Sequence, residues 1–185
     1  MLSVANPGFP LLPGSTDRLL AQAPSFGIGG AIGDATAEGP VIFVFPIMGA
    51  VGGASISLLL GKRARAILMA LTGAVGFGVG SLPVLLISGL AINRIDVQGA
   101  VLLLVLGAAQ GVVGVASLGL GLRDPERARY LLLGATLGFG IGALVARAFV
   151  YELGVPMFVI WGAIGGAGLG AALGYLEKKK ADTQS

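Results

Sequence analysis

Few side chains of this sequence could take part in chemistry, and the two strongest candidates lie inside apolar segments. Gln110 is the most polar residue deep within an apolar run, and Arg147 lies near the end of another. A buried amide of this kind makes an interhelical hydrogen bond or contacts a solute or ion. Arg147 can extend to the far interface or pair with Glu152. Gln110 and Arg147 are therefore the candidate residues of a polar path.

The residue types that usually carry out catalysis are missing. The chain has no cysteine and no histidine, which removes thiol chemistry, the usual zinc and haem ligands and the commonest general base. Gly61-Lys62 is followed by arginine, so it does not match a nucleotide-binding loop. We therefore expect no enzymatic activity, no bound metal and no cofactor.

The composition indicates which elements must hold these side chains. Hydrophobic residues make up 55% of the 185 residues, charged residues only 11%, and the mean hydropathy is +0.92. Soluble domains carry about 25% charged residues, so this chain lacks the polar surface that water requires. Five apolar runs are long enough to cross a bilayer as helices and lack the alternation of barrel strands. The expected transmembrane helices are Val41–Gly61, Ala66–Ile92, Val97–Leu122, Tyr130–Val150 and Val155–Leu176.

The basic residues predict the orientation. Residues 62–65, 123–129 and 178–180 hold nine of the 12 basic residues, and all three sites fall on one side of an alternating topology. The positive-inside rule assigns that side to the cytoplasm. We expect an integral membrane protein, of a bacterial inner membrane, with a cytoplasmic C-terminus. The basic residues form no coherent face, so the expected partners are the lipid bilayer and other membrane subunits or further copies, not nucleic acid.

A repeated pattern links the N-terminal region to the apolar runs. The sequence Phe26-Gly27-Ile28-Gly29 returns at 139–142, and Phe-Gly-Val-Gly occupies 77–80. Residues 26–61 and 139–174 share 14 of 36 positions at a constant offset of 113. "GAVGGAS" at 49–55 returns as "GVVGVAS" at 111–117, an offset of 62. Two helix types therefore alternate, which indicates a helical hairpin present three times.

The predicted fold class is an all-α polytopic membrane bundle of three repeated helical hairpins. It has five clear transmembrane helices and a short, degenerate first helix at about 18–37, where Asp34 and Glu38 lower the hydropathy. The expected organisation is an N-terminal tail (1–17), hairpins at 18–62, 63–123 and 124–178, of which the second has the longer helices, and a cytoplasmic tail (179–185).

Glycines spaced by four residues form stripes on the expected helices. In lipid, small residues let helix backbones approach closely, and this contact holds bundles together. Packing along these stripes, as a glycine zipper, is the main interpretation, and the lining of a narrow pore is the alternative. The stripe residues are Gly49, Gly53, Gly76, Gly80, Gly134, Gly138, Gly142, Gly162, Gly166, Gly170 and Gly174.

The functional prediction follows from dense packing chemistry combined with few reactive groups. We expect a non-catalytic integral membrane protein that serves as a scaffold or as an accessory or assembly subunit. The alternative is a small pore or carrier for ions or a neutral solute, with Gln110 and Arg147 along its path.

Overall fold

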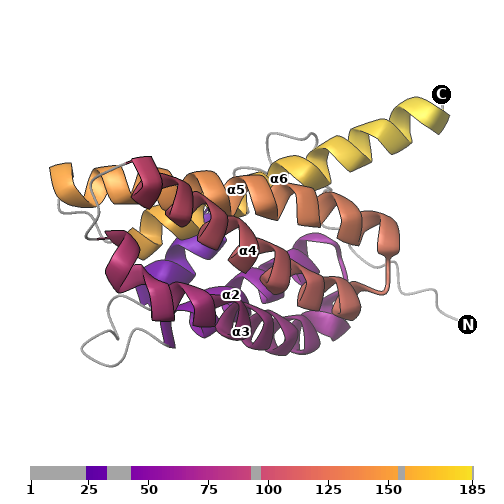
Figure 1. The fold of residues 1–185 in the computed structure, drawn as a ribbon. Coiled ribbons are helices and arrows are strands. Elements are labelled where there is room, and N and C mark those ends of the chain that lie inside the picture. The colour runs from indigo at the N-terminus through magenta and orange to yellow at the C-terminus, as the bar shows by residue number, and fades with distance from the viewer. Residues whose placement is uncertain (1–23, 33–42, 93–96, 154–156, 185) are drawn as a thin grey trace, which may run out of the picture.

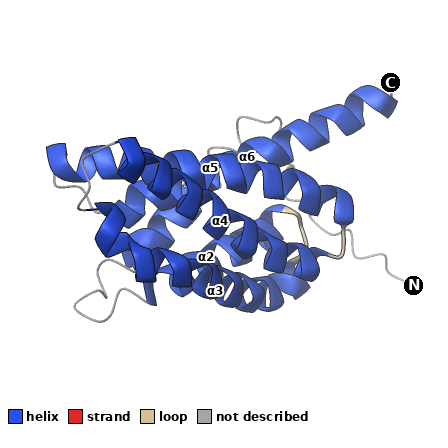
Figure 2. Cartoon of the chain, viewed as in Figure 1, coloured by secondary structure: helices blue, strands red, loops and turns tan. Residues whose placement is uncertain are grey.

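A computed structural model describes residues 24–32, 43–92, 97–153 and 157–184 of this chain. The described residues are almost entirely helical and contain no strand, which confirms the all-α class for this part of the chain (Figure 2). A first helix covers residues 24–32. The elements that follow are α2 (Val44–Leu59), the 3-10 turn η2 (Arg63–Arg65), α3 (Ala66–Ile92), α4 (Val97–Leu122), α5 (Pro125–Leu153) and α6 (Met157–Gln184) (Figure 1).

Four of these helices are long and apolar enough to cross a membrane. The candidate spans lie in α3, α4, α5 and α6, whereas α2 has only 16 residues. At 1.5 Å per residue α2 is about 24 Å long, shorter than a hydrocarbon core of about 30 Å. The described residues therefore contain four candidate spans where the sequence predicted five. The expected start of the second helix at Val41 lies outside the described residues.

The helix ends agree with hydropathy in the middle of the chain and depart from it in α5 and α6. The bounds of α3 and α4 coincide with the predicted ones. However, α5 starts at Pro125 because the Asp124 carboxylate accepts a hydrogen bond from the Arg127 backbone N–H, at 3.1 Å, and Pro125 is well suited to a first helical position. The last helix, α6, continues through the predicted tail to Gln184, and its final turns extend past the neighbouring helices (Figure 1).

Consecutive helices pack against one another in antiparallel pairs from α2 to α6. The direction follows from the contacts: α2 meets α3 through Gly49 near Gly73 and, one turn later, through Gly53 near Met69. The short first helix lies between α2 and α6. In that helix a Cβ at Gly29 would lie 2.8 Å from Met48 Cα. On its other side, a Cβ at Gly27 would lie 3.3 Å from the Ala163 Cβ of α6, so the first helix contacts both of these helices.

Large apolar side chains cover the outside of this bundle. On α3 they recur every three or four residues and expose 46–82% of their surface. Contiguous apolar surface of this kind is unfavourable in water and suits the acyl chains of a bilayer. The outward-facing residues of α3 are Ile67, Leu71, Val75, Val79, Leu82 and Leu86.

Candidate functional site

Three phenylalanine rings meet at the centre of the bundle. Phe26, Phe77 and Phe139 are fully buried and come from the first helix, α3 and α5. Their ring centroids lie 5.7 Å (Phe26–Phe77), 5.8 Å (Phe26–Phe139) and 5.1 Å (Phe77–Phe139) apart. Tilted and edge-on pairs at these distances are favourable beyond the area they bury. We call this cluster the phenylalanine triad; each member begins one copy of the F-G-[IV]-G pattern.

Each ring of the phenylalanine triad lies on a glycine of the following helix. A Cβ at Gly52 of α2 would overlap the Phe26 ring. A Cβ at Gly114 of α4 would lie 2.6 Å from Phe77 Cε2. Gly165 of α6 receives the Phe139 ring in the same way. Because any side chain at these positions would occupy the space of a ring, glycine is what allows the rings to reach the centre.

The predicted stripe glycines lie at several different contacts. On α2, Gly49 and Gly53 face α3, where a Cβ would overlap the carbonyl oxygens of Gly73 and Met69. On α3, Gly76 and Gly80 face α4, at Ser117 and Gln110. Three stripe glycines of α5 face α6: Gly134, Gly138 and Gly142.

On α6, the glycines of α5 face residues that are not members of the predicted stripe. Instead, α5 packs against Trp161, Gly165, Gly168 and Ala172, whereas Gly162 faces the carbonyl of Phe26 in the first helix. The other stripe residues of α6 are buried: Gly166, Gly170 and Gly174.

Gln110 lies on the inner face of α4 and is fully buried. Its Nε2 and Oε1 atoms have no hydrogen-bond partner among the described residues, so the expected interhelical hydrogen bond is not made there. The backbone at Gln110 is held against α3, since a Cβ at Gly80 would lie 3.1 Å from the Gln110 carbonyl oxygen. Buried polar atoms are hydrogen-bonded in more than about 90% of cases. The amide is therefore the most unusual polar group described in the core.

Trp161 is a second core residue with unused hydrogen-bonding capacity, and it was not among the predicted site residues. It is 1% exposed on α6, and its Nε1 has no partner among the described residues. Its ring packs edge-on against Phe45 of α2 at 5.5 Å and parallel to Phe158 at 6.2 Å. The signal was its position in the repeat, since Trp161 and Gln110 correspond to the same position, Met48, at offsets of 113 and 62.

Hydroxyl side chains in the helices mostly bond to their own backbone. Ser81, fully buried in α3, donates to the Gly78 carbonyl at 2.7 Å. Ser117 of α4 also reaches a neighbouring helix, because its Oγ lies 2.8 Å from the Thr72 carbonyl oxygen of α3 as well as 2.6 Å from that of Gly114. Sequence alone could not reveal this α3–α4 contact, since a serine that bonds only within its own helix has the same spacing pattern.

Arg147, the other residue of the predicted polar path, is half-buried near the end of α5. It follows Phe139 by eight residues, or about two helical turns. The side chain of Glu152, its expected partner, lies outside the described residues. Gln110 and Arg147 thus lie on different helices, and no described contact joins them.

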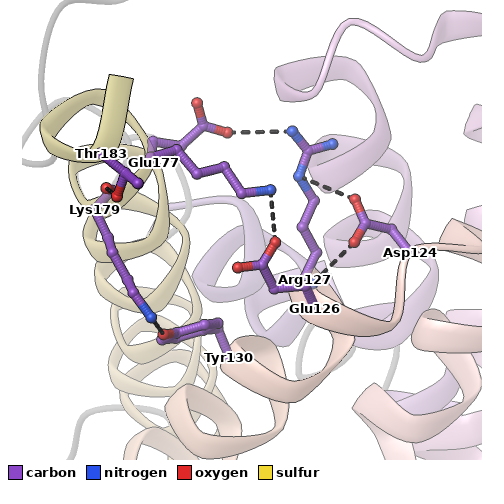
Figure 3. Close-up of polar contacts among 8 residues, drawn as sticks. Asp124, Glu126, Arg127, Tyr130, Glu177, Lys179 and Thr183 are labelled. Carbon is purple, nitrogen blue, oxygen red and sulfur yellow. Dashed lines mark hydrogen bonds and ion pairs between the residues drawn. The ribbon is translucent and has the colours of Figure 1, made fainter. Parts of the chain in front are cut away.

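A set of charged residues joins α5 to the end of α6 (Figure 3). Arg127 Nη2 lies 3.4 Å from Glu177 Oε1, and Lys180 Nζ lies 2.9 Å from Glu126 Oε2. Lys179 Nζ donates to the Tyr130 hydroxyl at 3.1 Å. These contacts extend the helix beyond the apolar part of α6, which explains why the predicted tail is helical.

The basic clusters meet at one end of the bundle. Arg65 Nη1, just before α3, donates to the Leu122 carbonyl at the end of α4 at 3.1 Å. The start of α5 follows directly and contacts the end of α6 through Arg127 and Glu177. The α2–α3, α4–α5 and C-terminal basic clusters therefore lie side by side. Comparisons of the chain with protein families, with curated proteins and with solved structures found no match.

Proposed function

We propose that this chain is a non-catalytic membrane protein whose three helical hairpins close into a ring. In this proposal it serves as a scaffold or as an accessory or assembly subunit of a bacterial inner membrane, with the C-terminus in the cytoplasm. The four apolar helices support the membrane environment. The packing of the core supports the scaffold or subunit role, and the distribution of charge supports the cytoplasmic C-terminus.

One observation carries the proposal: the same aromatic contact occurs three times. The pairs are Phe26 with Gly52, Phe77 with Gly114, and Phe139 with Gly165. The phenylalanines are related by the repeat offsets 51 and 113, and the glycines by 62 and 113. A repeat that came only from a shared apolar composition would not place equivalent residues in equivalent contacts. The triple contact supports three copies of one packing unit.

Contacts between neighbouring helical hairpins support closure of the ring. Gly49 of α2 packs on α3, Gly111 of α4 packs on α5, and Gly162 of α6 packs on the first helix. These three glycines are equivalent under the offsets 62 and 113. The last contact joins α6, the last described helix, to the first helix. We infer that the first helix is the sixth member of the bundle and not part of a tail.

A small pore or carrier is the competing proposal, and the buried amide of Gln110 favours it. The phenylalanine triad argues against a route along the axis, because three contacting rings fill the centre at that level. A protein whose interior is filled in this way is better suited to holding its shape and contacting partners than to conduction.

Two experiments test these proposals. Cross-linking in native membranes, followed by detergent extraction, should recover the chain with a partner or with further copies. Recovery only as a lone monomer would contradict the scaffold or subunit role. Reconstitution into vesicles tests the competitor: flux of ions or of a neutral solute that Gln110→Leu abolishes would favour a pore or carrier, and tight vesicles would exclude it.

A further inference from the structure

Polar groups from three helices lie at one level of the bundle core. Gln110 precedes Gly114 by four residues, and Trp161 precedes Gly165 by four. These two glycines receive rings of the phenylalanine triad, and α4 and α6 run in the same direction because both are antiparallel to α5. Gln110 and Trp161 are therefore each about one turn, or about 6 Å, from the triad on the same side.

Ser81 belongs to the same level. It follows Phe77 by four residues on α3, which runs antiparallel to α4, so it too lies one turn beyond the triad in the same direction. The level lies toward the end of the bundle opposite the basic clusters, since α4 runs from Gln110 toward the basic end at Arg123. All three residues are 0–1% exposed. Buried hydrogen-bonding groups of three helices thus occur within one layer, which we call the polar layer.

The polar layer has unused hydrogen-bonding capacity of both kinds. The Nε2 and Oε1 atoms of Gln110 and the Nε1 of Trp161 make no hydrogen bond to the described residues. The Ser81 hydroxyl uses its proton on Gly78 but keeps lone pairs that can accept. Three N–H bonds are therefore available to donate, and the oxygens of Gln110 and Ser81 are available to accept. The three side chains are uncharged.

We propose that the polar layer is an internal binding site for a small neutral molecule that both donates and accepts hydrogen bonds. Such a molecule would accept from the Trp161 indole and the Gln110 amide, and donate to Gln110 Oε1 or Ser81 Oγ. Water has this chemistry and occupies buried polar sites in globular proteins. A small hydroxyl- or amide-bearing solute shares it. At this level α3 packs closely on α4 at Gly80, and α5 packs closely on α6 at Gly142, so we expect a small ligand. The site does not depend on whether the bundle acts as a scaffold or a carrier.

The single tryptophan gives a direct readout of this site. Trp161 is the only tryptophan in the chain, so ¹⁵N-indole labelling gives one Nε1–H resonance in the full-length protein in lipid nanodiscs. We expect magnetisation transfer between this proton and water, although the ring is 1% exposed. Titration with glycerol and with urea distinguishes bound water from a bound solute. If the indole resonance does not move and magnetisation transfer from water is seen, the bound molecule is water. If the resonance shifts with solute concentration and the shift saturates, the layer binds that solute.

Variants test whether Gln110 and Trp161 share the bound molecule. Gln110→Leu should abolish the transfer to the indole proton. Thr136→Val is the control, because its hydroxyl bonds to Leu132 of its own helix at 2.7 Å, on the other side of the triad, and the transfer should persist. Wild-type protein that shows neither transfer from water nor a shift with either solute would overturn the proposal, and this measurement needs no variant to fold. Transfer that persists unchanged in Gln110→Leu would overturn the shared site.

Discussion

Replacing Gly73 by alanine should separate α2 from α3. A Cβ at Gly73 would overlap the Gly49 carbonyl oxygen and lie 2.9 Å from the Gly49 carbonyl carbon. These are backbone atoms and cannot rotate away. Ordinary contact between heavy atoms needs about 3.5 Å or more, so α2 and α3 must move apart by about 1 Å. Each van der Waals contact between the two helices then loses about a quarter to a half of its energy.

The size of the effect can be worked out with a matched variant on the same helix. At Gly78 a Cβ would meet only the side chain of Pro46, at 3.1 Å from Cγ, so Gly78→Ala requires this ring to shift by a few tenths of an ångström and leaves the neighbouring backbone in place. Both substitutions gain about 1 kcal/mol of helix propensity. Overpacking costs about 1–3 kcal/mol, so we expect Gly73→Ala to be less stable than Gly78→Ala by about that amount.

Reversible unfolding in mixed micelles, followed by the fluorescence of Trp161, measures this difference directly. The indole lies in the core and is the single tryptophan, so its emission reports loss of the packed bundle. Equal unfolding free energies for Gly73→Ala and Gly78→Ala would refute the close contact between the α2 and α3 backbones. Equal values would also contradict the close backbone contacts at the other glycines.

Three further predictions concern the triad, the end of α6 and the orientation. Phe26→Ala should lower the unfolding free energy by about 3–5 kcal/mol in the same assay, because it removes a ring that touches two others. An unchanged unfolding free energy would show that the first helix does not pack into the core. Glu177→Gln should change the free energy of unfolding by less than about 1 kcal/mol, since the Arg127–Glu177 pair is partly exposed. It should nevertheless speed the hydrogen exchange of backbone amides beyond Leu176. Unchanged exchange would mean that contacts other than this ion pair hold the end of α6 in a helix. Lys178→Cys, the only thiol in the chain, should react with an impermeant maleimide in inside-out vesicles and not in right-side-out vesicles; the opposite pattern would reverse the proposed topology.

Hydropathy predicted the helices whose ends coincide with the ends of apolar runs, α3 and α4. The bounds of α3 and α4 follow from the apolar runs alone, because polar or charged residues flank both runs in the sequence. It missed the two ends that are set by polar contacts: Asp124 at the start of α5 and the ion pairs of α6 with Arg127 and Glu126. A capping carboxylate and an interhelical ion pair depend on partners that a hydropathy profile does not register.

The candidate site was predictable in part. The spacing of glycines indicated close backbone contacts, but it did not identify which face of α6 meets α5. Small residues cover several sides of α6, so the regular stripe and the actual contact through Gly165 and Gly168 have nearly the same pattern. Gln110 was found because an amide in an apolar run is conspicuous. The role of Trp161 depends on its register relative to Gln110, which only the packed helices define.

A pair of engineered cysteines tests most directly whether the first helix completes the ring. A Cβ at Gly27 would lie 3.3 Å from the Ala163 Cβ of α6, close to the 3.5–4.5 Å that a disulfide requires, and the chain has no native cysteine. In native membranes, Gly27→Cys with Ala163→Cys should form an intramolecular disulfide nearly quantitatively, whereas Ile28→Cys, which faces outward, should not link to the same partner. Free thiols in both pairs after mild oxidation would contradict a ring closed by residues 24–32.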